Sequence, residues 1–83
     1  MSEDIKRQIK EIIINKYRLG IDKDDFDETR PFFEYGVGID SVANLELILE
    51  IEKKLKINID EAQIDAEVLF NFKNLYNYLI KNI

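Results

Sequence analysis

The chain has 83 residues, 46% of them hydrophobic, which is enough to form one small core, so we expect a single domain over residues 1–83. The net charge of −5 disfavours a nucleic-acid partner, whose phosphates need a concentrated basic surface. Histidine and cysteine are absent, which removes the usual general base, the soft metal ligands and the thiol nucleophile together. We therefore expect no catalytic residue and no metal site.

The sequence contains no export or membrane signal. No apolar run approaches the length of a membrane span, and residues 1–5 lack the basic and apolar regions of a signal peptide. We expect a cytoplasmic protein without a membrane partner. The absence of cysteine excludes a disulfide framework.

The N-terminal segment predicts a helix from Ser2 to about Arg18, with Gly20 following its end. Its apolar residues recur at the spacing of one helical face, at Ile5, Ile9, Ile12, Ile13 and Tyr17.

Residues 21–38 predict a long loop with five acidic residues between Asp22 and Glu28. A calcium-binding loop that begins at Asp22 is excluded, because Asp27 stands where glycine is needed and Phe33 where a bidentate glutamate is needed. A loop of this length needs anchors in the core or a function of its own. We expect Phe32 or Phe33, together with Phe26, to supply the anchors.

The most strongly helical segment begins after this loop and runs from about Ser41 to Leu55. Gly36 and Gly38 give the backbone freedom before it, and Asp40 and Ser41 are both residue types that cap helix starts. A phosphate attached to Ser41 would meet unpaired backbone N–H groups and the positive end of the helix dipole. Most serines in this position are only caps, however, and the spacing alone does not distinguish the two roles.

The same helix is predicted to carry two apolar stripes. The first, formed by Leu47, Ile48, Ile51 and Leu55, is sufficient to pack a small bundle. The second is formed by Val42, Leu45 and Leu49 and is flanked by Glu46, Glu50 and Lys53. Surplus apolar surface commonly marks a partner or ligand site, although a central helix can also be wrapped by core on most sides.

The remainder of the chain predicts a connector, a short helix and a final helix. Residues 57–60 read as an extended connector with Ile59 buried. A brief helix is expected around Asp65 to Leu69, with Ile64, Val68 and Leu69 facing inward. The last helix is expected from about Phe72 to Lys81, capped by Asn71, with an apolar face of Phe72, Leu75, Tyr76 and Leu79.

Four short motifs give the chain a family resemblance that covers nearly its whole length: Phe32-Phe33-Glu34-Tyr35-Gly36, Gly38-Ile39-Asp40-Ser41, Leu45-Glu46-Leu47 and Leu49-Glu50-Ile51-Glu52. With them the chain resembles the acyl and peptidyl carrier proteins. The resemblance implies an all-α, four-helix bundle with three main helices and one short one. It also implies a covalent 4'-phosphopantetheine on Ser41, with Asp40 as a helix-start acid and recognition contact. Carrier positions that match Val42, Leu45 and Leu49 typically meet enzymes, and Glu46 and Glu50 would add acidic contacts.

Two departures separate the chain from the fatty-acid type of carrier. That type commonly has leucine and then an acid after the serine, whereas Val42 and Ala43 stand here. Its recognition helix is also acidic throughout, whereas this one ends in Lys53, Lys54 and Lys56. The resemblance therefore implies a non-catalytic, stand-alone carrier of an acyl or aminoacyl thioester in a dedicated pathway of polyketide or nonribosomal type.

Such a carrier is expected to be a monomer served by a phosphopantetheinyl transferase, by an adenylating ligase or acyltransferase, and by downstream synthase or tailoring enzymes. Two alternatives remain open at this point. One is an acyl carrier of fatty-acid synthesis, and the other is an unmodified helical module that binds a partner helix.

Overall fold

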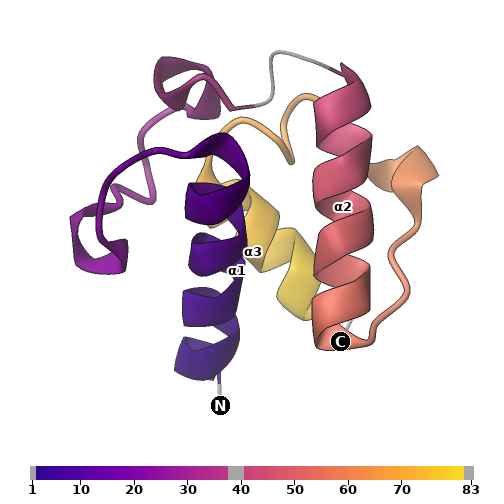
Figure 1. Cartoon of the computed structure of the whole chain (residues 1–83). Coiled ribbons are helices and arrows are strands. Elements are labelled where there is room, and N and C mark those ends of the chain that lie inside the picture. Colours follow the sequence, from indigo (N-terminus) through magenta and orange to yellow (C-terminus); the bar gives the residue numbers. More distant parts are fainter. Residues whose placement is uncertain (1, 38–40, 82–83) are drawn as a thin grey trace.

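The computed structural model describes residues 2–37 and 41–81 (Figure 1), and it is helical throughout with no strand among those residues. The three α-helices are α1 (Ser2–Tyr17), α2 (Ser41–Leu55) and α3 (Phe72–Lys81). Three short 3₁₀-helices lie in the connections, η1 (Lys23–Asp25), η2 (Phe32–Tyr35) and η3 (Glu61–Gln63). The predicted all-α fold with three main helices is confirmed.

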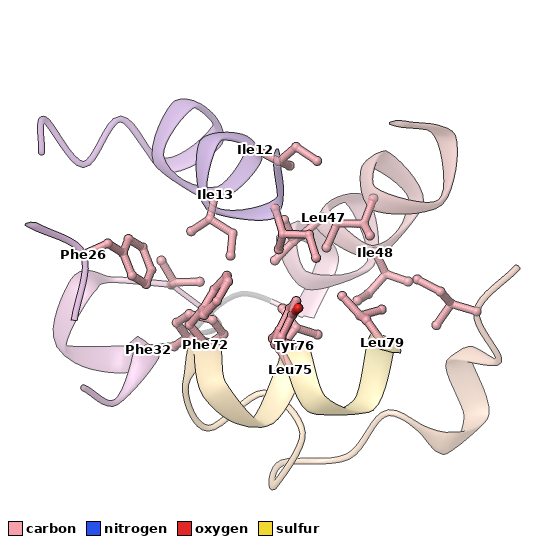
Figure 2. Packing of buried hydrophobic residues seen from close by; sticks show 14 residues of the cluster. Ile12, Ile13, Phe26, Phe32, Leu47, Ile48, Phe72, Leu75, Tyr76 and Leu79 are labelled. Atoms are coloured by element: carbon pink, nitrogen blue, oxygen red, sulfur yellow. The ribbon is translucent and has the colours of Figure 1, made fainter. Parts of the chain in front are cut away.

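The helices enclose one core. In Figure 1, α1 and α2 stand side by side and run in opposite directions, and α3 lies across them. Each helix turns its apolar stripe inward, so that buried residues from all three helices meet those of the loop between α1 and α2 (Figure 2). Among the described residues, no helix combines the length and the apolar character needed to cross a bilayer.

Two aromatic residues anchor the long loop in this core, as predicted. Phe26 and Phe32 are buried, whereas Phe33 is 61% exposed. The ring of Phe26 stacks on Tyr35 at 5.1 Å between centroids and meets the edge of Phe72 of α3 at 5.5 Å. Aromatic burial therefore ties the loop to α3 (Figure 2).

Hydrogen bonds join the same loop to the start of α3. The backbone N–H of Phe32 donates to the carbonyl of Phe70 at 2.7 Å, and that of Lys73 donates to the carbonyl of Glu28 at 2.9 Å. The side chain of Asn71 serves both segments, because its Oδ1 caps α3 by accepting from the N–H of Asn74 at 2.8 Å while its Nδ2 donates to the carbonyl of Thr29 at 3.2 Å. The predicted cap is confirmed, and it doubles as a tie to the loop.

α2 ends at Leu55, as predicted, and α1 ends within one residue of its predicted end. The residue that follows α1 in the left-handed conformation differs from the prediction. Gly20 was expected to end α1, but Arg18 takes the left-handed conformation (φ 51°), and the N–H of Leu19 donates to the carbonyl of Ile14 at 3.1 Å. The end of α2 repeats this arrangement with Lys56 (φ 55°). Because this bond satisfies an otherwise unpaired helix carbonyl and lets Leu19 pack against the core, a non-glycine residue is accommodated there.

The prediction of a short helix at Asp65 to Leu69 is wrong. The segment forms turns in which the N–H of Leu69 donates to the carbonyl of Asp65 at 3.2 Å, while the Asp65 carboxylate accepts from the N–H of Val68 at 3.0 Å. These bonds close a single turn capped by Asp65, and the chain leaves it at Phe70, whose carbonyl accepts from the N–H of Phe32 in the loop. The inward residues Ile64, Val68 and Leu69 are partly buried against the core, and Ile59 is buried as expected.

The two apolar stripes of α2 have different environments. Leu47, Ile48 and Ile51 are buried, and Leu55 is partly buried. Val42, Leu45 and Leu49 are 63%, 46% and 49% exposed, and we call these three residues the outer face of α2. The interpretation that the second stripe is also core is therefore excluded.

The difference between the two stripes predicts two classes of alanine variants. Leu47→Ala should lower the free energy of unfolding by about 2–5 kcal/mol, because it leaves a cavity in a closed core. Leu45→Ala and Leu49→Ala should cost less than about 1 kcal/mol, because much of each side chain already contacts water. Urea unfolding of the three variants measures this. Equal destabilisation by all three would show that the outer face is part of the core.

One acidic residue of the loop forms ion pairs with α1. The Glu28 carboxylate lies 2.8 Å from Nζ of Lys10 and 3.3 Å from Nζ of Lys6. Partial burial raises the pKa of Glu28, but hydrogen bonds and charge from the two lysines outweigh it, so the net pKa lies below the ordinary value of 4.5. The carboxylate form is thus favoured in the folded protein.

Glu28→Gln should lower the free energy of unfolding near neutral pH, because Lys6 and Lys10 lose their counter-charge. The pKa of Glu28 is lower in the folded than in the unfolded protein, so its contribution is complete above the ordinary carboxyl pKa. It is lost as the pH falls through the lowered pKa. Urea unfolding of both proteins across this acid range checks the prediction. Glu34→Gln is the control, because its ion pair with Arg30 is exposed and should matter little. A Glu28 effect that does not change with pH would contradict the electrostatic cause.

Candidate functional site

The loop approaches α2 through a fixed turn. Gly36 takes the left-handed conformation (φ 79°) at the end of η2, and a side chain there would meet no atom within 4 Å, so its backbone angle rather than lack of space requires glycine. The next residue, Val37, is buried and donates its N–H to the carbonyl of Phe32 at 3.0 Å. The chain is thus anchored in the core four residues before Ser41.

Ser41 is the first residue of α2, where the sequence predicted the helix to start. Asp40, which was predicted as its neighbouring recognition contact, lies outside the described residues, and so does the environment of the Ser41 side chain. Asp40 therefore stays a prediction. The position of Ser41 in the backbone is nevertheless established, because a helix of 15 residues begins there.

The N-terminal end of α2 suits an attached phosphodiester. The first turn of the helix contains no acidic residue, so no carboxylate within it opposes an anion. The backbone N–H groups of a first turn have no partner within the helix, and the helix dipole places partial positive charge there. Covalent 4'-phosphopantetheine, whose phosphate would be joined to Ser41, thus fits the electrostatics of this helix end.

A groove of about 410 Å³ lies beside the first turns of α2. Most of its lining is apolar, and two exposed aromatic rings, Phe33 from the loop and Phe70 from the segment before α3, contribute to it. Asn44 and Asp65 supply polar groups. The remaining lining residues are Val37, Ile64, Ala66 and Leu69.

The predicted partner contacts continue from this end along α2. All three residues of the outer face are exposed, and so are Glu46 and Glu50. Glu46 is not free, however, because Lys16 of α1 donates to its Oε2 at 3.2 Å. The five predicted contacts therefore form one exposed surface, in which part of the acidic character is already neutralised.

Sequence reasoning missed the groove and the Lys16–Glu46 pair. The groove brings together the loop, α2 and the segment before α3, and residues so far apart in sequence leave no local pattern. Phe70 was the available signal. It precedes the cap residue Asn71 and does not share the apolar spacing of the last helix, so its ring need not face the core.

The sequence of the chain also matches known proteins. Residues 7–78 fit the family model described as "Phosphopantetheine attachment site". Acyl carrier protein of Chloroherpeton thalassium is 32% identical over 79 residues, which cover 95% of this chain and 92% of that protein. Acyl carrier protein of Chlorobium phaeobacteroides is 30% identical over 93% of this chain and 92% of that protein. Acyl carrier protein of Chlorobium phaeovibrioides is also 30% identical, over 94% of each chain. The chain therefore belongs to the acyl carrier protein family, whose phosphopantetheine-binding domain carries covalent 4'-phosphopantetheine.

Proposed function

We propose that the protein holds an acyl or aminoacyl group as a thioester on a phosphopantetheine arm attached to Ser41, in a dedicated biosynthetic pathway. One observation supports Ser41 as the attachment residue. The sequence contains two serines, and only Ser41 lies within the residues matched by the phosphopantetheine-attachment model, since Ser2 precedes residue 7. The start of a long helix at Ser41 supports this choice.

The roles of the chain in this function are binding and presentation. Ser41 supplies the hydroxyl that takes the arm from coenzyme A, and the start of α2 stabilises the resulting phosphodiester anion. The arm supplies the thiol that the cysteine-free sequence lacks. The outer face, with Glu46 and Glu50, docks the enzymes that act on the arm. Deprotonation of Ser41 and the magnesium ion belong to the modifying transferase, and Asp40 is a recognition contact for it.

The charge of α2 supports the proposed pathway. α2 has Glu46 and Glu50 in its middle but Lys53 and Lys54 in its last turn, followed by Lys56. An enzyme whose basic surface matches a helix that is acidic throughout would meet like charges at this end. An adenylating ligase that loads an amino or carboxylic acid therefore suits the chain better. An acyl carrier of fatty-acid synthesis is the second candidate, favoured by the relatives' name, acyl carrier protein.

Ser41→Ala should abolish arm transfer and leave the protein folded. The test is incubation with coenzyme A and a broad-specificity phosphopantetheinyl transferase, followed by intact mass measurement. Ser2→Ala is the matched control, because Ser2 also begins an α-helix, and it should be modified like the wild type. Loss of a helix-start serine costs on the order of 1 kcal/mol, so circular dichroism should show a helical protein in both cases. Modification of Ser41→Ala would refute the assignment, and an unmodified wild type would favour a helical interaction module.

The pathway is tested by loading. The arm-bearing protein and a true fatty-acid carrier should be offered at equal concentration to the malonyl transferase of fatty-acid synthesis. We expect the present chain to be loaded more slowly, with the gap narrowing as salt screens the repulsion. Comparable rates at low and moderate salt would contradict the dedicated pathway and support the fatty-acid alternative.

A further inference from the structure

Lys53 continues the outer face of α2 by one helical turn. It follows Leu49 by four residues and Val42 by eleven, which places the three side chains within about 40° of one another around the helix axis. Lys53 is exposed and has no ion pair or hydrogen bond among the residues that the structure describes. An enzyme that covers Leu49 would therefore also meet this ammonium group.

Two carboxylates of α2 lie on the same side as Lys53. Glu50 precedes Lys53 by three residues, about 60° away around the helix axis, and forms no ion pair with it in the described structure. The other, Glu46, is already countered. Glu46 lies between Val42 and Leu49 in the sequence and points to the same side of the helix, about 40° from Val42. Lys16 of α1, whose side chain is 15% exposed, holds it at 3.2 Å. The outer side of α2 thus ends in a positive charge that forms no ion pair with a described residue.

Lys54 has a different environment although it is the next residue. One residue turns the helix by about 100°, which places Lys54 beyond Glu50 on the side of α1. Lys54 lines a groove there with Glu11 and Ile12 of α1, and Lys53 also borders this groove. The two lysines differ in their interaction with Glu11. The pKa of Glu11 is lowered mainly by its hydrogen bond and charge interaction with Lys23, and more weakly by Arg7 and Lys54. Lys54 therefore has a weak charge interaction with an acid of α1, although the two form no ion pair in the described structure.

We propose that Lys53 determines which enzymes dock on the outer face. It excludes enzymes with a basic docking surface. It selects an enzyme whose surface has an apolar pocket that receives Leu49 and a carboxylate that meets Lys53 one helical turn further along α2. Discrimination between two enzymes depends on the difference between their affinities for the carrier. Like charges brought together at the docking surface lower the affinity of the unsuitable enzyme. The inference rests on the proposed function, because it takes the outer face as the docking surface.

The test is a gain of activity toward a partner with the opposite charge preference. Malonyl transferase of fatty-acid synthesis is the probe, since the carriers it serves present an acidic helix and its docking surface must be complementary. Lys53→Glu should raise the kcat/KM for malonyl loading by about three- to tenfold at low salt, and the gain should shrink as salt is added. Lys54→Glu is the matched control, with the same change of net charge in the same helical turn, and it should change kcat/KM less than about twofold.

A second measurement tests the expected carboxylate. Exposed arginines and lysines of the transferase around its active-site entrance should be replaced singly by glutamate. At least one replacement should raise loading of the wild-type carrier and lower loading of Lys53→Glu, because the charges at one contact have been exchanged. If every replacement affects both carriers alike, Lys53 has no specific contact.

The outcomes separate this inference from the proposed function. Equal gains by Lys53→Glu and Lys54→Glu would show an effect of net charge and overturn the role of Lys53, as would no gain by either. Arm transfer from coenzyme A is recorded first for all variants, with circular dichroism to confirm the helical fold. Normal arm transfer with unchanged malonyl loading overturns only the role of Lys53, whereas failure of the wild type to accept the arm overturns both proposals.

Discussion

The fold depends on the attachment of the long loop to the start of α3. Phe26 and Phe32 fill the space between the loop and α3, and the N–H of Phe32 is paired with the carbonyl of Phe70 at 2.7 Å. Asn71 ties the two segments again through its side chain. The loop also carries several acidic residues, which favour contact with water. The burial of its aromatic side chains and the pairing of its backbone groups offset this preference. Because Val37 belongs to the same core, this attachment extends to four residues before Ser41.

The division of α2 into a buried and an exposed side links the fold to the function. Leu47 and Ile51 hold the helix against α1 and α3, so that its opposite side can remain apolar and exposed without loss of the core. The helix start offers positive partial charge where an anionic arm would be joined. One helix can therefore hold an arm at its first residue and present a docking surface along its length.

Much of this arrangement could be predicted from the sequence, because helical periodicity and caps are local signals. The three main helices, the cap at Asn71 and the two stripes of α2 follow from residues within a few turns of one another. The left-handed conformation of Arg18 did not follow, since a hydrogen bond formed by Leu19 outweighs the preference for glycine at the end of a helix. The turn at Asp65 to Leu69 did not follow either, because the chain leaves it at Phe70, which pairs with the distant residue Phe32.

Contacts between distant segments were the least predictable part of the site. Lys16 reaches Glu46 across 30 positions in the sequence, and the groove combines three separate segments. Pattern reasoning assigned Glu46 to partner binding as a free acid, because nothing near it in sequence reveals its counter-charge. The sequence likewise does not distinguish Lys53 from Lys54, because they are adjacent residues of the same type. They differ in the direction in which each projects from the helix axis.

The central claim is that Ser41 carries the arm, and direct localisation on the unaltered protein tests it most simply. Wild-type protein should be incubated with coenzyme A, magnesium and a broad-specificity phosphopantetheinyl transferase, then digested and fragmented in a mass spectrometer. We predict one arm per chain, joined through a phosphodiester to Ser41. An arm found on Ser2 or Thr29, or no arm at all under conditions that modify a known carrier, would contradict the claim.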